Sequence, residues 1–537
     1  MKQFWYKLYS KLPFNARVIT KLIYIFFIKN INKLYLTDSF PIVSPHKTFF
    51  NSPLFPKEEG YGYYAQYYHE KSVSNFVINP TDWLNYKTEI LYGYSVEKNF
   101  VYKSYIGERS LLPVSIVNNK LTNEQNDKFK IKLKVDNKEY LLKNCAQNRF
   151  YYLPINTLGD VELSCEFPTI IGKPIPVVQN RKNSKKLVLN IFIDGLASEA
   201  FKNKDLQTLM PNCYNYFKDD FITLNGHINA DWTISSVPTL MSGLHSIKHG
   251  VFSRSDSCSL GKGYKLISEL FQDSDYLTTQ ICSNYGKPPS MGYVKGFDKT
   301  IYQRSMSGDN VVNAFLEHLR AFDKRDNYVW LSIMDLHHFL DIVPAVSTQS
   351  KLDLMNCDYQ DRKKKSVVPG KDLKRVARYV EELKRIDFYL NIIFNYISSS
   401  YNKDEVVVAL CSDHGQSYFT DDEMLFSEQR TMVPMMIKGT IEKHGMTNFR
   451  VDNIDFLPTI LSLSDIKYNK NDFDGVFPAS LGGDDERNLS LAESIYPGKT
   501  YKAVITDHKN RFYFETKSLV NQDGSFQIED YNVKIIN

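Results

Sequence analysis

The sequence predicts an α/β protein, with a mostly parallel sheet sandwiched by helices and a small β domain ahead of it. The prediction rests on three apolar runs of strand length, each followed closely by an acidic residue. The runs are Leu187–Ile193 before Asp194, Tyr328–Met334 before Asp335, and Val406–Leu410 before Asp413. Near-continuous apolar strands that alternate with helical patterns are typical of parallel sheets covered on both faces.

The composition sets the broad class. A chain of 537 residues is long enough for two or three domains of roughly 100–200 residues each. A hydrophobic content of 43% and a charged content of 24% are ordinary for a globular protein, so long disordered stretches are not expected. The net charge of +5 is small for this length, and no nucleic-acid partner is therefore expected.

Residues 1–90 are an N-terminal segment that we expect to be partly helical. Its apolar run Leu22–Ile28 is closed by Lys29, so it is shorter than the roughly 20 residues of a membrane span, and no signal-peptide cleavage site follows. The stretch Trp5–Phe26 mixes apolar and basic residues in the pattern of an amphipathic surface helix. Two interpretations stay open: peripheral contact with a membrane, or a helix packed on the protein body.

Residues 91–180 are predicted to form a small β-rich accessory domain. Lys128–Val135 alternates polar and apolar residues, as a half-buried strand requires. The polar, basic stretch Val178–Lys186 has the composition of a linker. Residues 187–500 are then the predicted catalytic domain, and residues 501–537 a C-terminal tail with strands.

A long helix is predicted near Lys371–Phe394, because apolar residues recur there at helical spacing and form one face that packs on the sheet. The face comprises Leu373, Val376, Val380, Leu383, Ile386 and Leu390.

The seven cysteines are odd in number, scattered, and free of any Cys-x-x-Cys pair. Neither a disulfide framework nor a thiolate zinc site is indicated. A reducing compartment fits best, so we expect the protein to be cytoplasmic. An amphipathic N-terminus would also allow peripheral attachment at the inner face of the membrane.

Four short segments carry the chemistry. They are Asp194-Gly195 after the first strand, Asp231–Gly250 with its hydroxyl cluster, Met334–Phe339 with its histidine pair, and Cys411–Gly415. A single acid at a strand end is more often a helix cap, and a Ser/Thr cluster before a helix is also commonly a cap. Three strand-end carboxylates that share one sheet edge, with histidines beside them, instead indicate a ligand site. Carboxylate and imidazole at Asp413 and His414 suit zinc or manganese.

The order of these segments resembles the sulfatase-like branch of the alkaline phosphatase superfamily. A strand ends in a metal-binding Asp, matched by Asp194. A nucleophile opens a helix, matched by Thr233, and the helix leads into the motif Gly-x5-His-Gly, matched by Gly243–Gly250. The Ser-Asp-His-Gly motif follows at 412–415, with Asp455–Thr459 and Ala492–Ser494 later in the same order. The match Thr233-x-x-Ser236-Val237-Pro238 is similar to phosphoethanolamine transferases that modify surface glycolipids.

The resemblance implies an alkaline phosphatase-like fold and a metal-dependent enzyme. Asp194, Asp413 and His414 would hold a divalent cation, zinc or manganese, with Thr233 as a further ligand and the nucleophile. One metal site is expected. A second metal site or a substrate contact would involve Asp335, His337 and His338, and of these His337 aligns with the histidine that phosphoethanolamine transferases place near the phosphate. His249 is expected to be structural.

Thr233 favours phosphorus over sulfur, because sulfatases need a Cys or Ser that is oxidised to formylglycine and a β-branched Thr cannot give that aldehyde. The predicted function is transfer or hydrolysis of a phosphate ester through a phospho-threonine. A phosphate-ester donor and a glycan or glycolipid acceptor would be its partners, in a phosphoethanolamine-type modification of a surface glycan or its precursor. The alternatives are a sulfatase-like hydrolase of another ester, or a degenerate member that binds a glycan without turnover.

Overall fold

The computed structural model describes most of the chain after residue 60. The described residues are 61–67, 87–96, 100–117, 130–143, 145, 149–178, 183–253, 260–261, 263–283, 292–303, 306–338, 370–422, 424–439 and 444–536, and all belong to one compact unit. The predicted amphipathic segment Trp5–Phe26 lies outside them.

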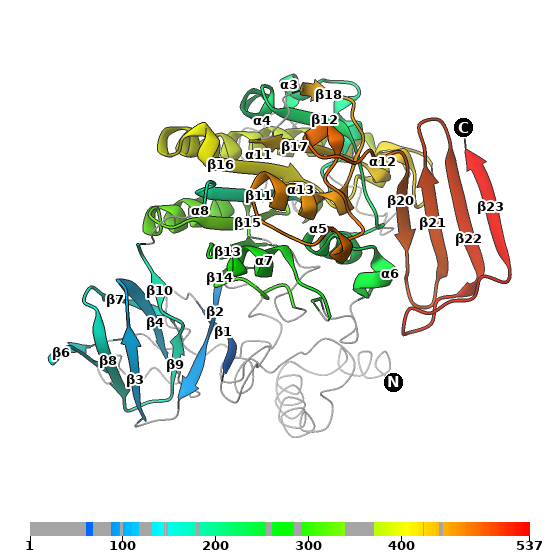
Figure 1. Cartoon of the computed structure of the whole chain (residues 1–537). Helices are drawn as coiled ribbons and strands as arrows, with labels where there is room; N and C mark the ends of the chain where they lie inside the picture. The colour runs from blue at the N-terminus through cyan, green and yellow to red at the C-terminus, as the bar shows by residue number, and fades with distance from the viewer. Residues whose placement is uncertain are drawn as a thin grey trace, which may run out of the picture. The chain divides into compact units, whose positions relative to one another are not determined.

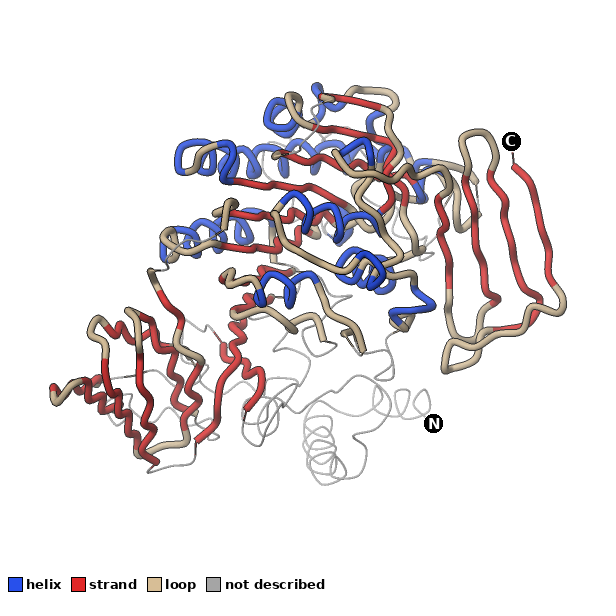
Figure 2. The backbone as a smooth tube through the Cα atoms, in the orientation of Figure 1, coloured by secondary structure: helices blue, strands red, loops and turns tan. Residues whose placement is uncertain are grey.

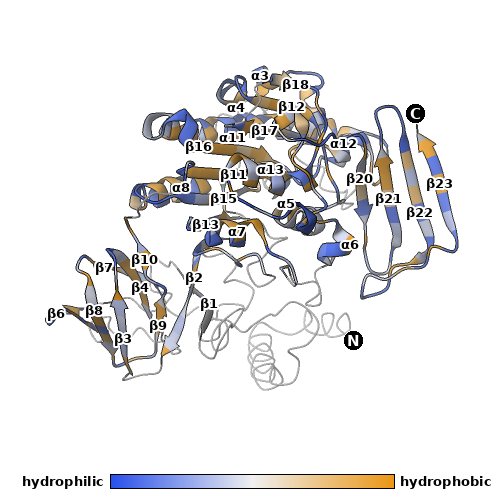
Figure 3. Cartoon of the chain, in the orientation of Figure 1, coloured by the Kyte–Doolittle hydropathy of each residue, from blue (hydrophilic) through white to orange (hydrophobic). Residues whose placement is uncertain are grey.

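The centre of the molecule is a set of five parallel strands in the spatial order β14, β13, β15, β11 and β16 (Figure 1). Their bounds are Lys299–Tyr302 (β14), Leu277–Cys282 (β13), Asn327–Ile333 (β15), Leu187–Ile193 (β11) and Val406–Cys411 (β16). Every residue of β11, β15 and β16 is buried, and Figure 3 shows β11 and β16 in apolar colours. The predicted α/β fold with helices on both faces of a mostly parallel sheet is confirmed.

Two apolar cores cover the two faces of this sheet, and Figure 2 shows the helices above and below the strands. Along β11, Leu189 and Ile191 enter one core, whereas Val188 and Phe192 enter the other. The first core is closed by α3 (Leu206–Leu209), α4 (Pro211–Phe217), α8 (Gly308–Ala321) and α11 (Leu373–Ser400). The second is closed by α5 (Thr233–Ser242), α7 (Ile267–Asp273) and α13 (Phe456–Leu463).

The predicted long helix is α11, which continues six residues past Phe394 to Ser400. Leu383, Ile386 and Leu390 are buried as predicted. Leu373 is 70% exposed, so its assignment to the packed face was wrong. It is the first residue of the helix.

Further strands extend the central sheet on both sides. On one side lie β17 (Met432–Lys438), β12 (Phe221–His227), β18 (Gly445–Thr447) and β19 (Val451–Asp452). On the other side β2 (Thr88–Val96) pairs with β14, and further strands follow it. These are β1 (Tyr61–Tyr67), β4 (Ser110–Ile116), β7 (Tyr151–Ile155), β9 (Thr169–Gly172) and β10 (Ile175–Pro176). All of these strands pair antiparallel, except that β18 and β19 pair parallel to β12.

The accessory strands are therefore joined to the catalytic sheet through backbone hydrogen bonds. A second, separate sheet contains β3 (Phe100–Ile106), β8 (Gly159–Cys165), β5 (Ile131–Val135) and β6 (Lys138–Leu142). It packs on β4 and β9 through an apolar cluster that includes Leu133 and Val114. The alternating stretch that was predicted as a strand is β5, in which Ile131, Leu133 and Val135 are buried.

The C-terminal strands form a four-stranded antiparallel sheet of β20 (Ser490–Ser494), β21 (Thr500–Thr506), β22 (Arg511–Leu519) and β23 (Tyr531–Ile536). Its first strand precedes residue 501, so the sheet draws on the stretch expected to close the catalytic domain. The remaining short α-helices are α6 (Ser246–His249), α9 (Asp335–His338) and α12 (Glu428–Thr431). Across the described ranges, no helix combines the length and the apolar character that a membrane span needs.

Candidate active site

Three parallel strands bring acidic residues to one edge of the sheet. Ile193 of β11 pairs with Ile333 of β15, and Phe192 pairs with Cys411 of β16. Asp194 follows directly after β11, and Asp413 follows two residues after β16. The carboxyl ends of parallel strands are where open α/β sheets bind ligands, and both side chains are buried there.

The turn after Asp194 is held in place by side chains from distant segments. Gly195 has φ +73°, and a Cβ at this position would collide with the side-chain amide of Gln416. The hydroxyl of Tyr379 on α11 donates to Gly195 O at 2.9 Å and accepts from Ala197 N at 2.8 Å. Such contacts fix the direction in which Asp194 leaves its strand.

Asp413 is bonded on one oxygen and open on the other. Its Oδ1 accepts hydrogen bonds from Gly195 N at 2.9 Å and from His414 N at 3.0 Å. Its Oδ2 is buried without a hydrogen-bond donor among the described residues, and it lies 3.5 Å from His414 Nε2. Burying a carboxylate oxygen without a hydrogen-bond donor costs free energy unless a positively charged group lies beside it.

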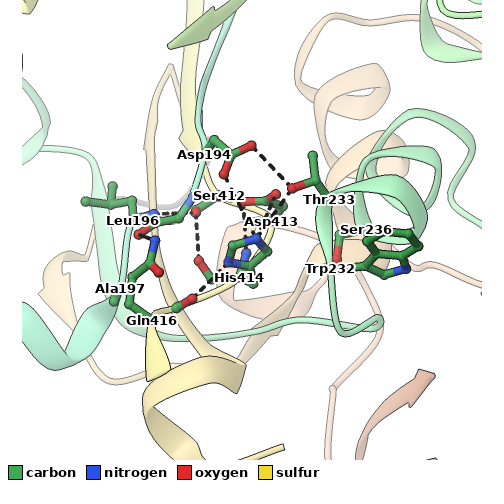
Figure 4. A network of polar contacts seen from close by, with 12 residues as sticks. Asp194, Leu196, Ala197, Trp232, Thr233, Ser236, Ser412, Asp413, His414 and Gln416 are labelled. Atoms are coloured by element: carbon green, nitrogen blue, oxygen red, sulfur yellow. Dashed lines mark hydrogen bonds and ion pairs between the residues drawn. The ribbon is translucent and has the colours of Figure 1, made fainter. Parts of the chain in front are cut away.

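The ring of His414 is oriented by its own loop. Nδ1 lies 2.8 Å from Gly415 O, and because a carbonyl only accepts, Nδ1 carries the proton. In the neutral ring Nε2 therefore presents a lone pair. It faces Thr233 Oγ1 at 3.4 Å, Asp413 Oδ2 at 3.5 Å and Asp194 Oδ1 at 4.0 Å (Figure 4). A histidine held through its second nitrogen in this way is typical of metal ligands.

Thr233 is the first residue of α5, and it points into the same space. Trp232 before it is extended, so the helix begins abruptly at Thr233. The Thr233 hydroxyl oxygen lies 3.3 Å from Asp194 Oδ2, and the residue is 8% exposed. Amide groups at the amino end of a helix favour negative charge, which suits an anionic ester at this position.

The rest of the segment in which the nucleophile is predicted forms the helix α5. Pro238 lacks the N–H that would bond Ile234 O, and the buried hydroxyl of Tyr293 donates to that carbonyl at 3.5 Å instead. Gly243 ends α5 in the left-handed conformation, with φ +66°. The Gly-x5-His-Gly motif thus marks the ends of two consecutive helices, since Gly250 ends α6 in the same way.

His249 closes this segment. Its Nδ1 accepts from Val251 N at 3.0 Å, and its Nε2 lies 3.2 Å from Thr239 Oγ1. Burial lowers the pKa of His249 to about 3, so the ring is neutral. These contacts agree with the structural role that was predicted for this residue.

Asp335 lies at the same edge but is used differently. It is fully buried, its Oδ1 accepts from Gly308 N at 3.0 Å, and it forms an ion pair with Arg385 of α11, which also contacts Glu382. Burial raises the pKa of Asp335 to about 6 despite the guanidinium. The structure therefore gives Asp335 a partner on α11 rather than a position in the metal site.

His337 stands beside the central cluster. One of its ring nitrogens lies within 4.8 Å of ligand atoms of Asp194 and His414, and the rings of His337 and His414 are 6.0 Å apart. The side chain of His338 lies outside the described residues. Of the three residues predicted for a second metal or substrate site, the structure brings His337 to the first site.

The donor atoms fit one divalent cation. Thr233 Oγ1, the Asp194 carboxylate and His414 Nε2 lie 3.3–4.0 Å from one another, and Asp413 Oδ2 lies 3.5 Å from His414 Nε2. Asp194, His337 and His414 form the group whose ligand atoms all lie within 4.8 Å of one another. Ligand atoms about 2.1 Å from a tetrahedral cation lie about 3.4 Å from one another. A divalent cation placed among these atoms would contact the His414 lone pair and the carboxylate oxygens together.

Several residues that support the site were not assigned this role from the sequence. Ser412 Oγ accepts from Leu196 N at 2.8 Å, and Asn453 Nδ2 donates to Ser412 O at 2.8 Å. Gln416 Nε2 donates to Gly195 O at 3.2 Å. Ser412 lies within the Ser-Asp-His-Gly motif and Gln416 follows it directly. Asn453 has no sequence signal, because its contact joins segments 41 residues apart.

Comparisons with known proteins identify the family of the chain. The family model described as Sulfatase matches residues 186–466, more than half of the chain. The solved structure of the Bacteroides fragilis protein yidJ, described as a sulfatase, has a TM-score of 0.52 at 13% identity, covering 67% of this chain and 90% of its own. A phosphonate monoester hydrolase from Silicibacter pomeroyi has a TM-score of 0.48 at 12% identity, covering 65% and 88%. No curated protein sequence matches the chain.

Proposed function

Because this chain belongs to the sulfatase family of the alkaline phosphatase superfamily, we propose that it cleaves or transfers a phosphate ester through a covalent intermediate on Thr233. Hydrolysis of sulfate or phosphate esters is the family's activity. We propose three finer points: the reacting centre is phosphorus rather than sulfur, the group can be transferred as well as hydrolysed, and the substrate is of the class named below. The observation that carries the proposal is the convergence of Thr233 Oγ1 with Asp194 and with the lone pair of His414.

A divalent cation is part of the proposal. Members of this family bind divalent metal, and Asp194, Asp413, His414 and Thr233 would hold it here. Zinc or manganese suits two carboxylates, an imidazole and a hydroxyl. When bound, such a cation activates an oxygen nucleophile and neutralises charge on the transferred group.

The residues of the chain define the reaction path. Thr233 Oγ1 attacks the phosphorus, the bond from phosphorus to the leaving oxygen breaks, and the leaving oxygen takes a proton from water and departs as the alcohol. The nearest carboxylate acceptor for the hydroxyl proton is Asp194 Oδ2, at 3.3 Å. Attack on the phospho-threonine by water releases phosphate and restores the hydroxyl, whereas attack by a glycan or lipid hydroxyl gives transfer.

The residue type at position 233 favours phosphorus. A threonine cannot be converted to the formylglycine aldehyde on which sulfate hydrolysis in sulfatases depends. The hydroxyl itself is suited to in-line attack on phosphorus once it is positioned at the start of α5.

The match Thr233-x-x-Ser236-Val237-Pro238 supports a phosphoethanolamine-type group as the substrate moiety. The donor would be a phosphate ester, and the acceptor a glycan, a glycolipid or a lipid-linked precursor.

The test is a substrate panel with the full chain: p-nitrophenyl phosphate, bis-p-nitrophenyl phosphate and p-nitrophenyl sulfate, each with zinc, with manganese and with a chelator. We expect metal-dependent release of nitrophenol from one of the phosphate esters and little from the sulfate. Turnover of the sulfate alone would overturn the choice of phosphorus. Absence of all turnover, with glycan binding intact, would favour the degenerate member.

A further inference from the structure

One face of the C-terminal sheet packs on the rest of the protein. Ala492 of β20, Val504 of β21 and Tyr513 of β22 are buried there, in an apolar cluster with Phe426 and Val433. The strand registers place these three residues on one side of the sheet, because Ala492 pairs with Val504 and Val504 pairs with Tyr513. The side chains that alternate with them along each strand point to the other side.

That opposite face is apolar across all four strands. Ile505 pairs with Leu491 on one side and with Phe512 on the other, and Phe512 then pairs with Ile535. A groove of about 430 Å³ runs over these residues. The outer face, as we call it, comprises Leu491, Tyr501, Ala503, Ile505, Phe512, Phe514, Tyr531, Val533 and Ile535, with Phe526 and Ile528 of the connection between β22 and β23 beside them.

The outermost strand separates apolar from polar residues. In β23 the side chains of Tyr531, Val533 and Ile535 belong to the outer face, and Asn532 and Lys534 alternate with them. This strand ends the sheet (Figure 1), and its residues 531–535 are exposed on both faces. Strict alternation of apolar and polar residues is typical of a strand that is buried on one face. The pattern therefore indicates that the outer face is covered by a partner.

Aromatic rings link the strands of the outer face. The ring of Phe526 stacks on Tyr501, with centroids 4.1 Å apart, and Tyr501 lies 6.1 Å from Phe514. The ring of Tyr531 on β23 lies 5.1 Å from Phe514. Side chains that already pack on one another lose little conformational freedom on binding, so the surface is preorganised for a partner.

The outer face carries almost no charge. Within the four strands, the registers place one charged side chain on this side, Glu493. It is 2% exposed, and its carboxylate accepts hydrogen bonds from Ile247 N and from the Tyr501 hydroxyl, each at 3.2 Å. A partner can therefore cover the outer face without burying an unpaired charge.

The charges around the outer face narrow the class of partner. Residues 500–536 contain five basic and five acidic residues, so this stretch has no net charge. Anionic membranes attract surfaces with an excess of Lys and Arg, which is not present here. A neutral apolar surface meets no repulsion from a copy of itself, and homodimer interfaces are the more apolar class of protein interface. The residues counted are Lys502, Lys509, Arg511, Lys517 and Lys534, and Asp507, Glu515, Asp523, Glu529 and Asp530.

The exposed area is that of a small dimer interface. Five residues of the patch are 41–62% exposed, and at about 150–200 Å² for a fully exposed side chain they present on the order of 450 Å². The partly exposed residues raise this to roughly 650 Å² per copy, or about 1,300 Å² for two copies, and standard interfaces bury about 1,200–2,000 Å². The five residues are Ile505, Ile528, Tyr531, Val533 and Ile535.

We propose that the outer face binds the outer face of a second copy of this chain in a dimer with twofold symmetry. Two apolar sheet faces pack about 10 Å apart, so the faces of the two copies form one closed apolar core. Because the same surface is used on both copies, the assembly closes at two. The dimer does not depend on which ester the candidate active site cleaves.

The experiment is sedimentation velocity of the full chain from about 0.5 to 200 µM. We expect a reversible equilibrium between monomer and dimer, with a Kd of about 1–50 µM for an interface of this area. Val533→Lys places a charge in the middle of the outer face and should raise the Kd about 30-fold or more. Val533 is 55% exposed in the single chain, so the variant should fold, and urea unfolding checks this.

The matched control is Asn532→Lys, which adds the same charge one residue earlier on the other face of β23. It should form the dimer as the parent chain does. A chain that stays monomeric up to about 200 µM overturns the proposal, and so does equal weakening in both variants or growth beyond two copies. Flotation with phosphatidylcholine vesicles provides a further check. Binding of monomers to these vesicles that Val533→Lys removes would assign the outer face to lipid instead.

Discussion

At the scale of single residues, the hydrogen bond from His414 Nδ1 to Gly415 O sets the chemistry of the ring. The adjacency of Asp413 and His414 after an apolar strand predicts a ligand pair from the sequence. Which nitrogen is available depends on backbone geometry, which the sequence does not specify. The structure shows that the lone pair of His414 Nε2 and the Asp413 Oδ2 oxygen lie 3.5 Å apart.

The first prediction concerns Thr233. Replacing it with alanine should lower turnover of a phosphate ester by about three orders of magnitude or more, because covalent catalysis and positioning are lost together. Thr233→Ser keeps the hydroxyl and should retain measurable activity. Steady-state kinetics and urea unfolding of both variants check this.

Loss of a helix cap alone would instead cost about 0.5–2 kcal/mol of stability and leave turnover nearly unchanged. Full activity in Thr233→Ala would refute the nucleophile. Phosphopeptide mapping after a slow substrate should locate the phosphate on Thr233 rather than on Ser235 or Ser236.

The second prediction separates the two histidines of the site. His414→Ala removes a buried lone pair, so metal content after dialysis should fall to a small fraction of that in the parent chain. His337 is exposed, and four other groups already face the cation space, so His337→Ala should keep its metal and lose about tenfold or more in kcat/KM. Elemental analysis measures the metal content of each variant, and steady-state kinetics measure its kcat/KM. Metal loss in His337→Ala would make that ring a ligand instead.

At the scale of elements, α11 supports the turn after β11 through the hydroxyl of Tyr379. Tyr379 bonds both Gly195 O and Ala197 N. Tyr379→Phe would leave the buried Ala197 N without this acceptor, and Gly195 O would keep only the hydrogen bond from Gln416 Nε2. We expect a loss of about 1–3 kcal/mol in unfolding free energy and metal binding weaker by up to about tenfold.

The matched control is Tyr396→Phe, nearer the carboxyl end of the same helix. It should change neither quantity. Equal effects in both variants would mean that the hydroxyl of Tyr379 does not support the site. Urea unfolding and metal titration provide the two readouts.

Helix α8 carries a histidine that should make stability depend on pH. Asn327 Nδ2 donates to Phe322 O and Arg325 O, so its Oδ1 is the acceptor for His318 Nε2 at 3.1 Å. Burial lowers the pKa of His318 to about 3. In the unfolded chain His318 takes up a proton near pH 6.5, and in the folded chain it does not. The stability that depends on a neutral His318 is therefore fully present above pH 6.5 and is lost as the pH falls toward 3.

His318→Gln keeps a donor and removes the titration. Between pH 6 and pH 4, the parent chain should lose about 1.4 kcal/mol per pH unit more than the variant. Urea unfolding at several pH values measures the difference. Parallel pH profiles for the two chains would show that His318 is protonated in the folded state.

The elements predicted from the sequence were those with strong local patterns. The buried strands β11, β15 and β16 and the helix α11 follow from apolar runs and helical spacing. The pairing of β2 with β14 joins segments about 200 residues apart, and no local pattern encodes it. The ion pair of Asp335 with Arg385 is missed for the same reason, since the partner lies 50 residues along the chain.

At the scale of the whole molecule, the candidate metal site joins segments that are far apart in the sequence. Asp194 follows β11, Thr233 begins α5, and Asp413 and His414 follow β16. Without a cation, two buried carboxylates both face the lone pair of His414. A cation bound only by the folded chain would stabilise it by linkage, by about 2.7 kcal/mol when the free metal is 100-fold above its Kd.

The last prediction follows from that linkage. Removing metal with a chelator should lower the unfolding temperature of the full chain, and Asp413→Asn should abolish most of this difference. The asparagine oxygen can still accept from Gly195 N and His414 N, while its amide group would take the place of Oδ2 and donate to the lone pair of His414, 3.5 Å away. Without metal, the Asp413→Asn variant should therefore be more stable than the parent chain, although its activity is lost. Such a trade of stability against activity is common in functional sites.

Thermal unfolding of both chains, with zinc or with chelator, tests this. An equal rise with zinc in both chains would remove Asp413 from the ligand set.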